Sequence, residues 1–307
     1  MRKALISTLL DMAQQDDRIV FLTADLGWSV VDVFAERFPG RFINVGVAEA
    51  NMMGIATGLA IEGYIPFVYS IATFSSMRPY EQFRNGPVLH HLPVRVIGVG
   101  GGFAYAHAGP THYALEDLAI MRAQPGCTVL APADPAQTRS ALLATRAIPG
   151  PVYLRVGKGG NPEVPGLNGR FALGQPELVR EGSDLLIIAT GAAACKALAA
   201  AEALAREGRS AAVAVLAHLG QEASLELNLL LSRFRVVLSV EEAFSCGGLG
   251  SLIAETVAKR GLPCRLGVAG VRSSFEEEFG SEAWLASRHG IDAASLAVAG
   301  KRLLENP

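Results

Sequence analysis

Residues 44–54 read NVGVAEANMMG, and in them an apolar strand pattern gives way to a helix of small residues. Glu49 is the one charged residue of this stretch, and no cationic partner lies close to it in sequence. Burial disfavours the charged form of a carboxyl group, and a protonated acid can share its proton with a ring nitrogen. Two interpretations follow: Glu49 either opens the helix and complements its dipole, or it is a catalytic acid.

Strand-like and helix-like segments alternate outward from this stretch. Short runs rich in Val, Ile and Leu predict strands at 19–23, 42–45, 65–69, 94–99, 128–131 and 152–156. Helical patterns lie at 1–15, 50–61, 75–89, 115–123 and 136–147. Continuous apolar strands separated by helices are typical of a parallel sheet with both faces covered.

The second half repeats this style after a segment rich in Gly, Pro and Asn. Strands are predicted at 185–189, 211–216, 236–240 and 265–268, with helices between them and two short helices over 283–304. The sequence therefore predicts an α/β protein of two domains, each a mostly parallel sheet with helices on both faces. The expected division is 1–160, a linker at 161–182, and 183–307.

Composition narrows the classes of function. The chain has 307 residues, half of them hydrophobic and 18% charged, with a net charge of -2. No basic stripe or aromatic platform indicates nucleic-acid binding. No apolar run reaches the ~18 residues of a membrane span, and the N-terminus does not have a signal-peptide pattern. We expect a cytoplasmic protein whose four cysteines are reduced and which holds no metal itself.

Three glycine-rich places could bind ligands. The one at 98–102 does not have the spacing of a phosphate loop or a dinucleotide fingerprint, whereas 247–250 opens a helix and suits either an anion or close packing. In the third, GPTH at 109–112, His112 precedes a helix at a sheet edge where ligands bind in such folds. Phe74, at a strand-to-helix junction, could offer its ring face to a heteroaromatic ring.

The ordered motifs resemble the transketolase family over nearly the whole chain. The first half carries GVAEANM at 46–52, an aromatic-rich run at 69–85, and GPTH followed by LED at 115–117, as in the pyrimidine-binding domain. The second half carries DLLIIATG at 184–191, and Glu-Glu at 241–242 before GGLG at 247–250, as in the transketolase C-terminal domain.

The resemblance implies thiamine diphosphate as the cofactor. It assigns Glu49 to the ring nitrogen N1′ of the aminopyrimidine, where a shared proton drives the amino–imino tautomerism. It assigns Phe74 to stacking on the pyrimidine and Met77 to the same cofactor site. It places His112 against an oxygen of the donor substrate. The implied contacts to the substrate's phosphate are Arg2, Ser29 and Arg155, with Lys158 able to add charge.

Two departures bear on the substrate. The family has an aspartate before Gly-Pro-Thr-His that reads a sugar hydroxyl, and Ala108 stands there. A histidine or aspartate after the strand at 94–99 is replaced by Gly100. Recognition of the donor must therefore differ in part from that of the wider family.

A third departure concerns the cofactor. The family binds the diphosphate and Mg²⁺ through a Gly-Asp-Gly motif, which this sequence does not contain. The resemblance thus implies a partner subunit that holds the diphosphate and Mg²⁺. It also implies an α₂β₂ heterotetramer, in which this subunit associates with a second copy of itself. The implied reaction moves a two-carbon ketol unit from an anionic ketose to an aldehyde.

Three alternatives stay open. The β subunit of a 2-oxo acid dehydrogenase has the same domain plan, although it usually carries a histidine-serine pair in place of Gly-Pro-Thr-His. 1-Deoxyxylulose-5-phosphate synthase shares the motifs but is normally one long chain. A non-catalytic scaffold could have kept the fold, although the joint presence of Glu49, Phe74 and His112 argues against it.

Overall fold

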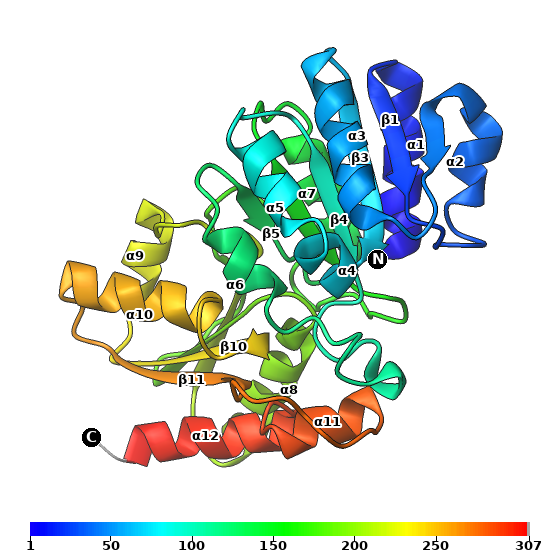
Figure 1. Cartoon of the computed structure of the whole chain (residues 1–307). Coiled ribbons are helices and arrows are strands. Elements are labelled where there is room, and N and C mark those ends of the chain that lie inside the picture. The colour runs from blue at the N-terminus through cyan, green and yellow to red at the C-terminus, as the bar shows by residue number, and fades with distance from the viewer. Residues whose placement is uncertain (306–307) are drawn as a thin grey trace.

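A six-stranded sheet forms the centre of the N-terminal domain in the computed structural model, which describes residues 1–305 (Figure 1). Its strands are β1 (Ile19–Thr23), β2 (Phe42–Asn44), β3 (Ile65–Ile71), β4 (Arg95–Val99), β5 (Thr128–Leu130) and β6 (Val152–Val156). They lie in the order β2-β1-β3-β4-β6-β5, and every neighbouring pair is parallel. All six strands fall within or next to predicted segments, because their apolar runs are covered on both faces.

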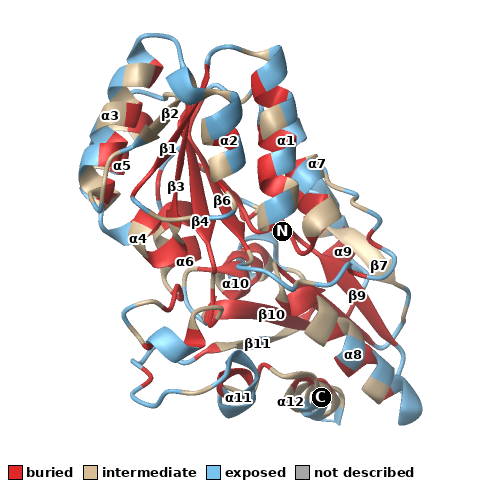
Figure 2. Cartoon of the chain, turned by 90° about the vertical axis from the view of Figure 1, so that its right-hand side faces the viewer, coloured by how far each residue is buried: buried red, intermediate tan, exposed pale blue. Residues whose placement is uncertain are grey.

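Helices cover both faces of this sheet (Figure 2). On one face lie α1 (Arg2–Gln15), α2 (Asp32–Arg37) and α7 (Pro135–Thr145), which share a hydrophobic core with the strands. On the other lie α3 (Glu49–Ile61), α5 (Tyr80–Phe83) and α6 (Asp117–Arg122). The short α2 was not predicted from the sequence.

The helix predicted at 75–89 is wrong as a single element. The chain instead forms α4 (Ala72–Met77), then α5, then a π-helical turn at Arg84–Val88. Pro79 lies between the first two pieces and Pro87 lies in the turn. Because proline has no N–H for the helical ladder, it breaks a helix into such segments. The first segment, α4, begins directly after β3.

The C-terminal domain is built on a five-stranded sheet of order β11-β10-β8-β9-β7. Its strands are β7 (Glu177–Arg180), β8 (Leu185–Ala189), β9 (Ala211–Val215), β10 (Val236–Phe244) and β11 (Arg265–Val271). Only β7 is antiparallel to its neighbour. The helices are α8 (Ala193–Arg206), α9 (Leu225–Ser232), α10 (Leu249–Arg260), α11 (Glu282–Arg288) and α12 (Ala293–Glu305). The predicted α/β class with two sheets is confirmed.

The segment predicted as a linker, 161–182, is not linker throughout, because β7 lies inside it and pairs with β9. The two domains also meet closely. The N–H of Ala131 donates to the carbonyl of Ala217 at 2.7 Å, and that of Leu219 donates to Val129 at 2.9 Å. One hydrophobic core contains side chains of both domains. Loops of the first domain can therefore be held in place by the second.

Within residues 1–305, no helix combines the length and the apolar content that a bilayer crossing requires.

Candidate active site

The predicted site residues gather at one edge of the N-terminal sheet. Ser29 follows β1, Glu49 follows β2, Phe74 follows β3, His112 lies in the loop after β4, and Lys158 follows β6. All of these strands run the same way, so their carboxyl ends open on the same side. That edge is where ligands bind in open parallel α/β sheets.

Glu49 is the first residue of α3 and is 2% exposed. The hydroxyl of Ser70 donates to its Oε1 at 3.1 Å, and Nη1 of Arg78 donates to its Oε2 at 2.8 Å. Glu49 therefore has a cationic partner in space, although none lies close to it in sequence. Arg78 is 29 positions away in sequence, and the arrangement of β3 and α4 brings it back.

Aromatic groups continue this cluster. The guanidinium carbon of Arg78 lies 3.8 Å from the centre of the Phe74 ring. The Phe74 ring meets the His112 ring edge to face, with 5.1 Å between centres. Met77 lies at the end of the same helix, partly exposed, where its sulfur accepts a hydrogen bond from Thr73. Arg78 thus links Glu49 to Phe74, and Phe74 in turn contacts His112.

The turn before His112 requires glycine. Gly109 has φ of +78° and ψ of -173°, a conformation that is accessible almost only to glycine. A Cβ on Gly109 would also collide with the Phe279 ring of the C-terminal domain. Within the turn, the N–H of His112 donates to the Gly109 carbonyl at 2.9 Å, and Thr111 Oγ1 lies 2.9 Å from His112 Nδ1.

A cavity of about 490 Å³ is lined by residues of both domains. Arg2, Lys158 and Lys196 line it, together with Glu242 and Glu282. Lys196 is paired with Glu242. Burial raises the pKa of the Glu282 carboxyl, an effect that Glu242 strengthens. Of the predicted phosphate contacts, Arg2 and Lys158 share this cavity.

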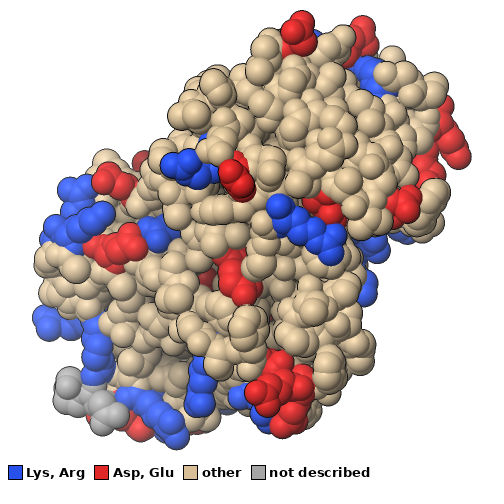
Figure 3. Space-filling view, viewed as in Figure 1, with Lys and Arg blue, Asp and Glu red and all other residues tan. Residues whose placement is uncertain are grey.

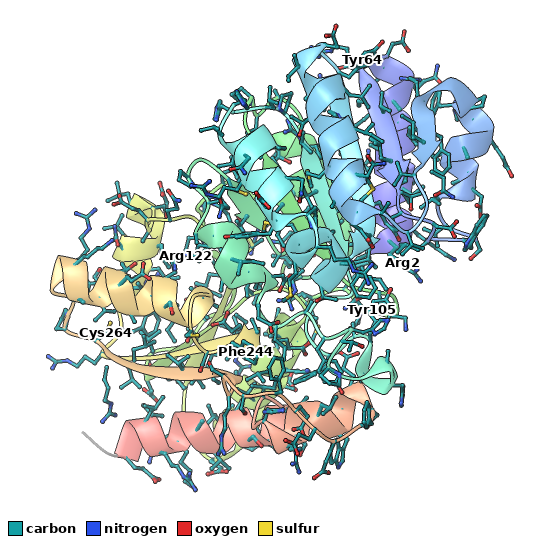
Figure 4. The ribbon with its side chains drawn as sticks, in the orientation of Figure 1. Arg2, Tyr64, Tyr105, Arg122, Phe244 and Cys264 are labelled. Atoms are coloured by element: carbon teal, nitrogen blue, oxygen red, sulfur yellow. The ribbon has the colours of Figure 1, made fainter. Side chains whose placement is uncertain are left out.

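Tyr105 connects the cavity to the histidine. The ammonium group of Lys158 lies 4.3 Å from the centre of the Tyr105 ring, and that ring is 6.3 Å from the His112 ring. Burial raises the pKa of the Tyr105 hydroxyl, while the charge of Arg2 acts in the opposite sense. Figure 4 shows Arg2 and Tyr105 close together where the domains meet. The Tyr105 ring is therefore a neighbour both of Lys158, which lines the cavity, and of His112.

Neither Arg155 nor Ser29 lines the cavity that Arg2 and Lys158 share. Arg155 is buried, and its Nη2 donates to the carbonyls of Ala114 at 2.6 Å and Glu242 at 2.8 Å. Its Nε is 3.3 Å from a carboxylate oxygen of Asp117. Ser29 is exposed, with φ of +63°, and does not line the cavity. Their substrate roles stay predictions, and the contacts of Arg155 favour a role in joining the domains.

The glycines at 247–250 surround an internal anion. Glu241 accepts hydrogen bonds from the N–H groups of Leu249 and Gly250, both at 2.8 Å, and so occupies the start of α10. Burial raises the pKa of the Glu241 carboxyl, while these backbone hydrogen bonds oppose that rise. The Glu241 side chain therefore takes up the N–H groups at the start of α10, where the sequence suggested that an anion could bind.

Comparison with known proteins follows the same two-part division. The transketolase pyrimidine-binding domain model matches residues 1–162, and the transketolase C-terminal domain model matches residues 174–294. The chain belongs to the transketolase family. This is the family that the sequence motifs resemble, and its two-domain α/β fold is the fold expected from the sequence.

Relatives of this transketolase-family chain include subunits of divided enzymes. The 6-deoxy-6-sulfo-D-fructose transketolase subunit SqwH of Clostridium sp. is 39% identical, with 99% of this chain and 94% of that protein aligned. A subunit of the apulose-4-phosphate transketolase of Phocaeicola vulgatus is 34% identical, with 86% of each aligned. A solved structure described as a split gene transketolase, inactive beta4 tetramer, is 36% identical, with a TM-score of 0.88 over 99% of this chain and 97% of that one.

The transketolase family depends on thiamine diphosphate, and the residues at the sheet edge fit its pyrimidine half. The flat, nitrogen-bearing guanidinium group of Arg78 lies against Phe74 and binds Glu49. Phe74 and Glu49 can therefore accept a planar group that carries a hydrogen-bonding nitrogen. Within residues 1–305, no cluster of three or more His, Cys, Asp or Glu side chains is suited to a metal ion. The fit therefore concerns the ring of the cofactor.

Sequence reasoning missed Arg78, Tyr105 and Lys196. The family resemblance directs attention to motif positions; Tyr105 and Lys196 lie outside the motifs, and Arg78 lies inside the run at 69–85 without an assigned role. A signal for Arg78 was available, because it lies in the same short run as Phe74. Lys196 is on α8 of the other domain and carried no local signal.

Proposed function

We propose that this chain is the pyrimidine-binding subunit of a split, thiamine diphosphate-dependent enzyme that transfers a two-carbon ketol unit from a ketose to an aldehyde. The observation that carries the proposal is the grouping of Glu49, Phe74 and His112 at the carboxyl edge of a parallel sheet, where Arg78 joins the first two. The names of the Clostridium and Phocaeicola relatives, both transketolase subunits, support it.

Each side chain has a defined task in this proposal. When bound, thiamine diphosphate supplies a carbon nucleophile that becomes reactive once its aminopyrimidine changes tautomer. Glu49 holds a proton at the ring nitrogen N1′, and Ser70 fixes the carboxylate through Oε1. Phe74 offers a ring face for stacking. His112 donates a hydrogen bond to an oxygen of the donor substrate.

The substrate is an anionic ketose. Arg2 and Lys158 provide positive charge in the cavity between the domains, and the Tyr105 ring lies near both Lys158 and His112. The names of the relatives include a sulfonated sugar and a sugar phosphate, which both carry a terminal anion. A cationic side chain binds such a group through charge-assisted hydrogen bonds.

A partner subunit completes the enzyme by holding the diphosphate and Mg²⁺, in an α₂β₂ heterotetramer. The outward face of α3 beside Glu49 supports such an interface, because its exposed residues carry no charge: Asn51, Gly54, Gly58 and Ile61. Figure 3 shows that most of the N-terminal domain on this side is uncharged. The split relative that is described as a beta4 tetramer supports self-association of this type of subunit. The cytoplasmic location stays a prediction.

One alternative has a specific observation in its favour. The 1-deoxy-D-xylulose-5-phosphate synthase of Syntrophotalea carbinolica is 35% identical over 98% of this chain, which spans 47% of that protein. The same side chains would serve that reaction, which differs in starting from a 2-oxo acid. Release of carbon dioxide from pyruvate in place of ketol transfer would favour this alternative.

The test is an assay of ketol transfer by the chain mixed with a partner that carries Gly-Asp-Gly, thiamine diphosphate and Mg²⁺. Loss of proton sharing at N1′ removes general acid–base catalysis, so Glu49→Gln should lower turnover by about 10²-fold or more. Glu62→Gln is the matched control, because Glu62 is exposed at the other end of the same helix. Full activity of Glu49→Gln would refute the proposal.

A further inference from the structure

Arg78 makes two contacts that a stacked pyrimidine ring would also need. Its guanidinium carbon is 3.8 Å from the centre of the Phe74 ring, while Nη1 of the same group is 2.8 Å from Glu49 Oε2. The guanidinium group therefore lies between the ring face of Phe74 and the carboxylate. A ring that stacks on Phe74 and binds Glu49 cannot occupy this space together with Arg78.

We propose that Arg78 is an internal competitor of the cofactor ring: it pairs with Glu49 before the cofactor binds and moves toward solvent when the ring enters. This inference rests on the proposed function, because it assumes that Glu49 and Phe74 receive the pyrimidine. It assigns to Arg78 a role that ends when the cofactor binds.

The need for such a group follows from the burial of Glu49. Its side chain is 2% exposed, and the hydroxyl of Ser70 is its other hydrogen-bond partner. A buried carboxylate without a cationic partner is strongly destabilising. Arg78 supplies that partner from within the same subunit, so the isolated chain can fold around its catalytic carboxylate.

The surroundings of Arg78 allow it to leave. Its side chain is 44% exposed, so only part of it must be transferred from protein to water. Arg78 ends α4 with helical torsion angles, and Pro79 follows. The movement therefore needs only rotation of side-chain bonds, which takes place on a timescale of nanoseconds or less for exposed residues.

The decisive measurement is the affinity of thiamine diphosphate for the assembled complex, determined by titration calorimetry in the presence of Mg²⁺. Arg78→Gln removes the competing ion pair and the contact with Phe74, so we expect its dissociation constant to fall about fivefold or more. Arg84→Gln is the matched control, since Arg84 is exposed nearby and its side chain donates a hydrogen bond to Asn85, and its affinity should equal that of the wild type.

Thermal unfolding of the isolated chain gives a second readout. Arg78→Gln should lower the midpoint by several degrees, because Glu49 loses its cationic partner, whereas Arg78→Gln combined with Glu49→Gln should recover most of that loss. The control Arg84→Gln should leave the midpoint unchanged. Recovery in the double variant identifies the Glu49 contact as the cause.

The outcomes separate this inference from the function on which it rests. If the wild-type complex binds no thiamine diphosphate, the proposed function fails. If the wild type binds and Arg78→Gln binds more weakly, Arg78 holds the ring in place and the inference is wrong. Equal affinity of the two also overturns it, because a competitor must change the affinity when it is removed.

Discussion

Replacement of Arg155 by Met distinguishes two roles for this residue. The resemblance to the family assigns Arg155 to the substrate's phosphate, whereas in the structure its guanidinium group binds the carbonyls of Ala114 and Glu242 and lies 3.3 Å from Asp117. Asp117 is 0% exposed. The structure therefore predicts that Arg155→Met acts mainly on stability.

The magnitude follows from the burial of the pair. Removal of one partner of a buried ion pair leaves an uncompensated charge and costs ~3–5 kcal/mol. At about 2 °C of midpoint for each kcal/mol in a chain of this size, the expected loss is at least about 6 °C. Arg155→Met combined with Asp117→Asn should recover part of it, because the amide side chain carries no charge and its oxygen can still accept a hydrogen bond from Tyr153.

Scanning calorimetry of the isolated chain measures this loss. Arg139→Met is the control, since Arg139 is an exposed arginine whose ion pair with Asp11 spans 3.4 Å, and pairs of this type contribute little. An Arg155→Met chain that unfolds within about 1 °C of the wild type, and whose complex has a tenfold higher KM for an anionic donor, would refute the reasoning. Arg155 would then be a substrate contact.

Three further predictions concern the histidines and the turn before the site. His112→Ala should lower turnover of the complex by about 10²-fold in a ketol-transfer assay, because it removes a donor to the reacting oxygen; an unchanged rate would contradict this role. Burial lowers the pKa of His218 from 6.5 to about 4, so the unfolded chain binds more protons between these values and stability falls as the pH drops. From pH 7 to 5 the loss is about 2 kcal/mol by linkage, and denaturant unfolding of His218→Leu should show a correspondingly smaller acid loss than the wild type. Gly109→Ala should cost about 1–3 kcal/mol in the same experiment, because φ of +78° strains alanine; a neutral effect would show that the turn can relax.

The sequence predicted those parts of the fold whose signal is local. The strands of the first sheet are continuous apolar runs, and such runs are readable because each strand is covered on both faces. β7 was missed because it is a half-buried edge strand in which two of four residues are charged. Its position depends on pairing with β9, which lies over thirty residues further on.

The candidate site shows the same limit. Glu49, Phe74 and His112 stand in recognisable motifs, so their meeting could be expected from the resemblance. The partner of Glu49 could not, because it depends on the order of strands: Glu49 follows β2, Arg78 lies beyond β3, and β1 lies between these two strands. The pairing of Glu49 with Arg78 therefore depends on the strand order of the sheet, which the local sequence does not show.

The C-terminal domain is part of the site, although the motif residues lie in the other domain. The loop that carries His112 packs on it: the Phe103 ring stacks on the His289 ring with 5.2 Å between centres, and the N–H of Phe244 donates to the Leu115 carbonyl at 2.9 Å. Glu49 and Phe74 lie within about five residues of the ends of β2 and β3, so short connections to the sheet place them. A long loop does not hold one conformation without contacts of its own. The position of His112, and with it the geometry offered to a donor substrate, is therefore set by the second domain.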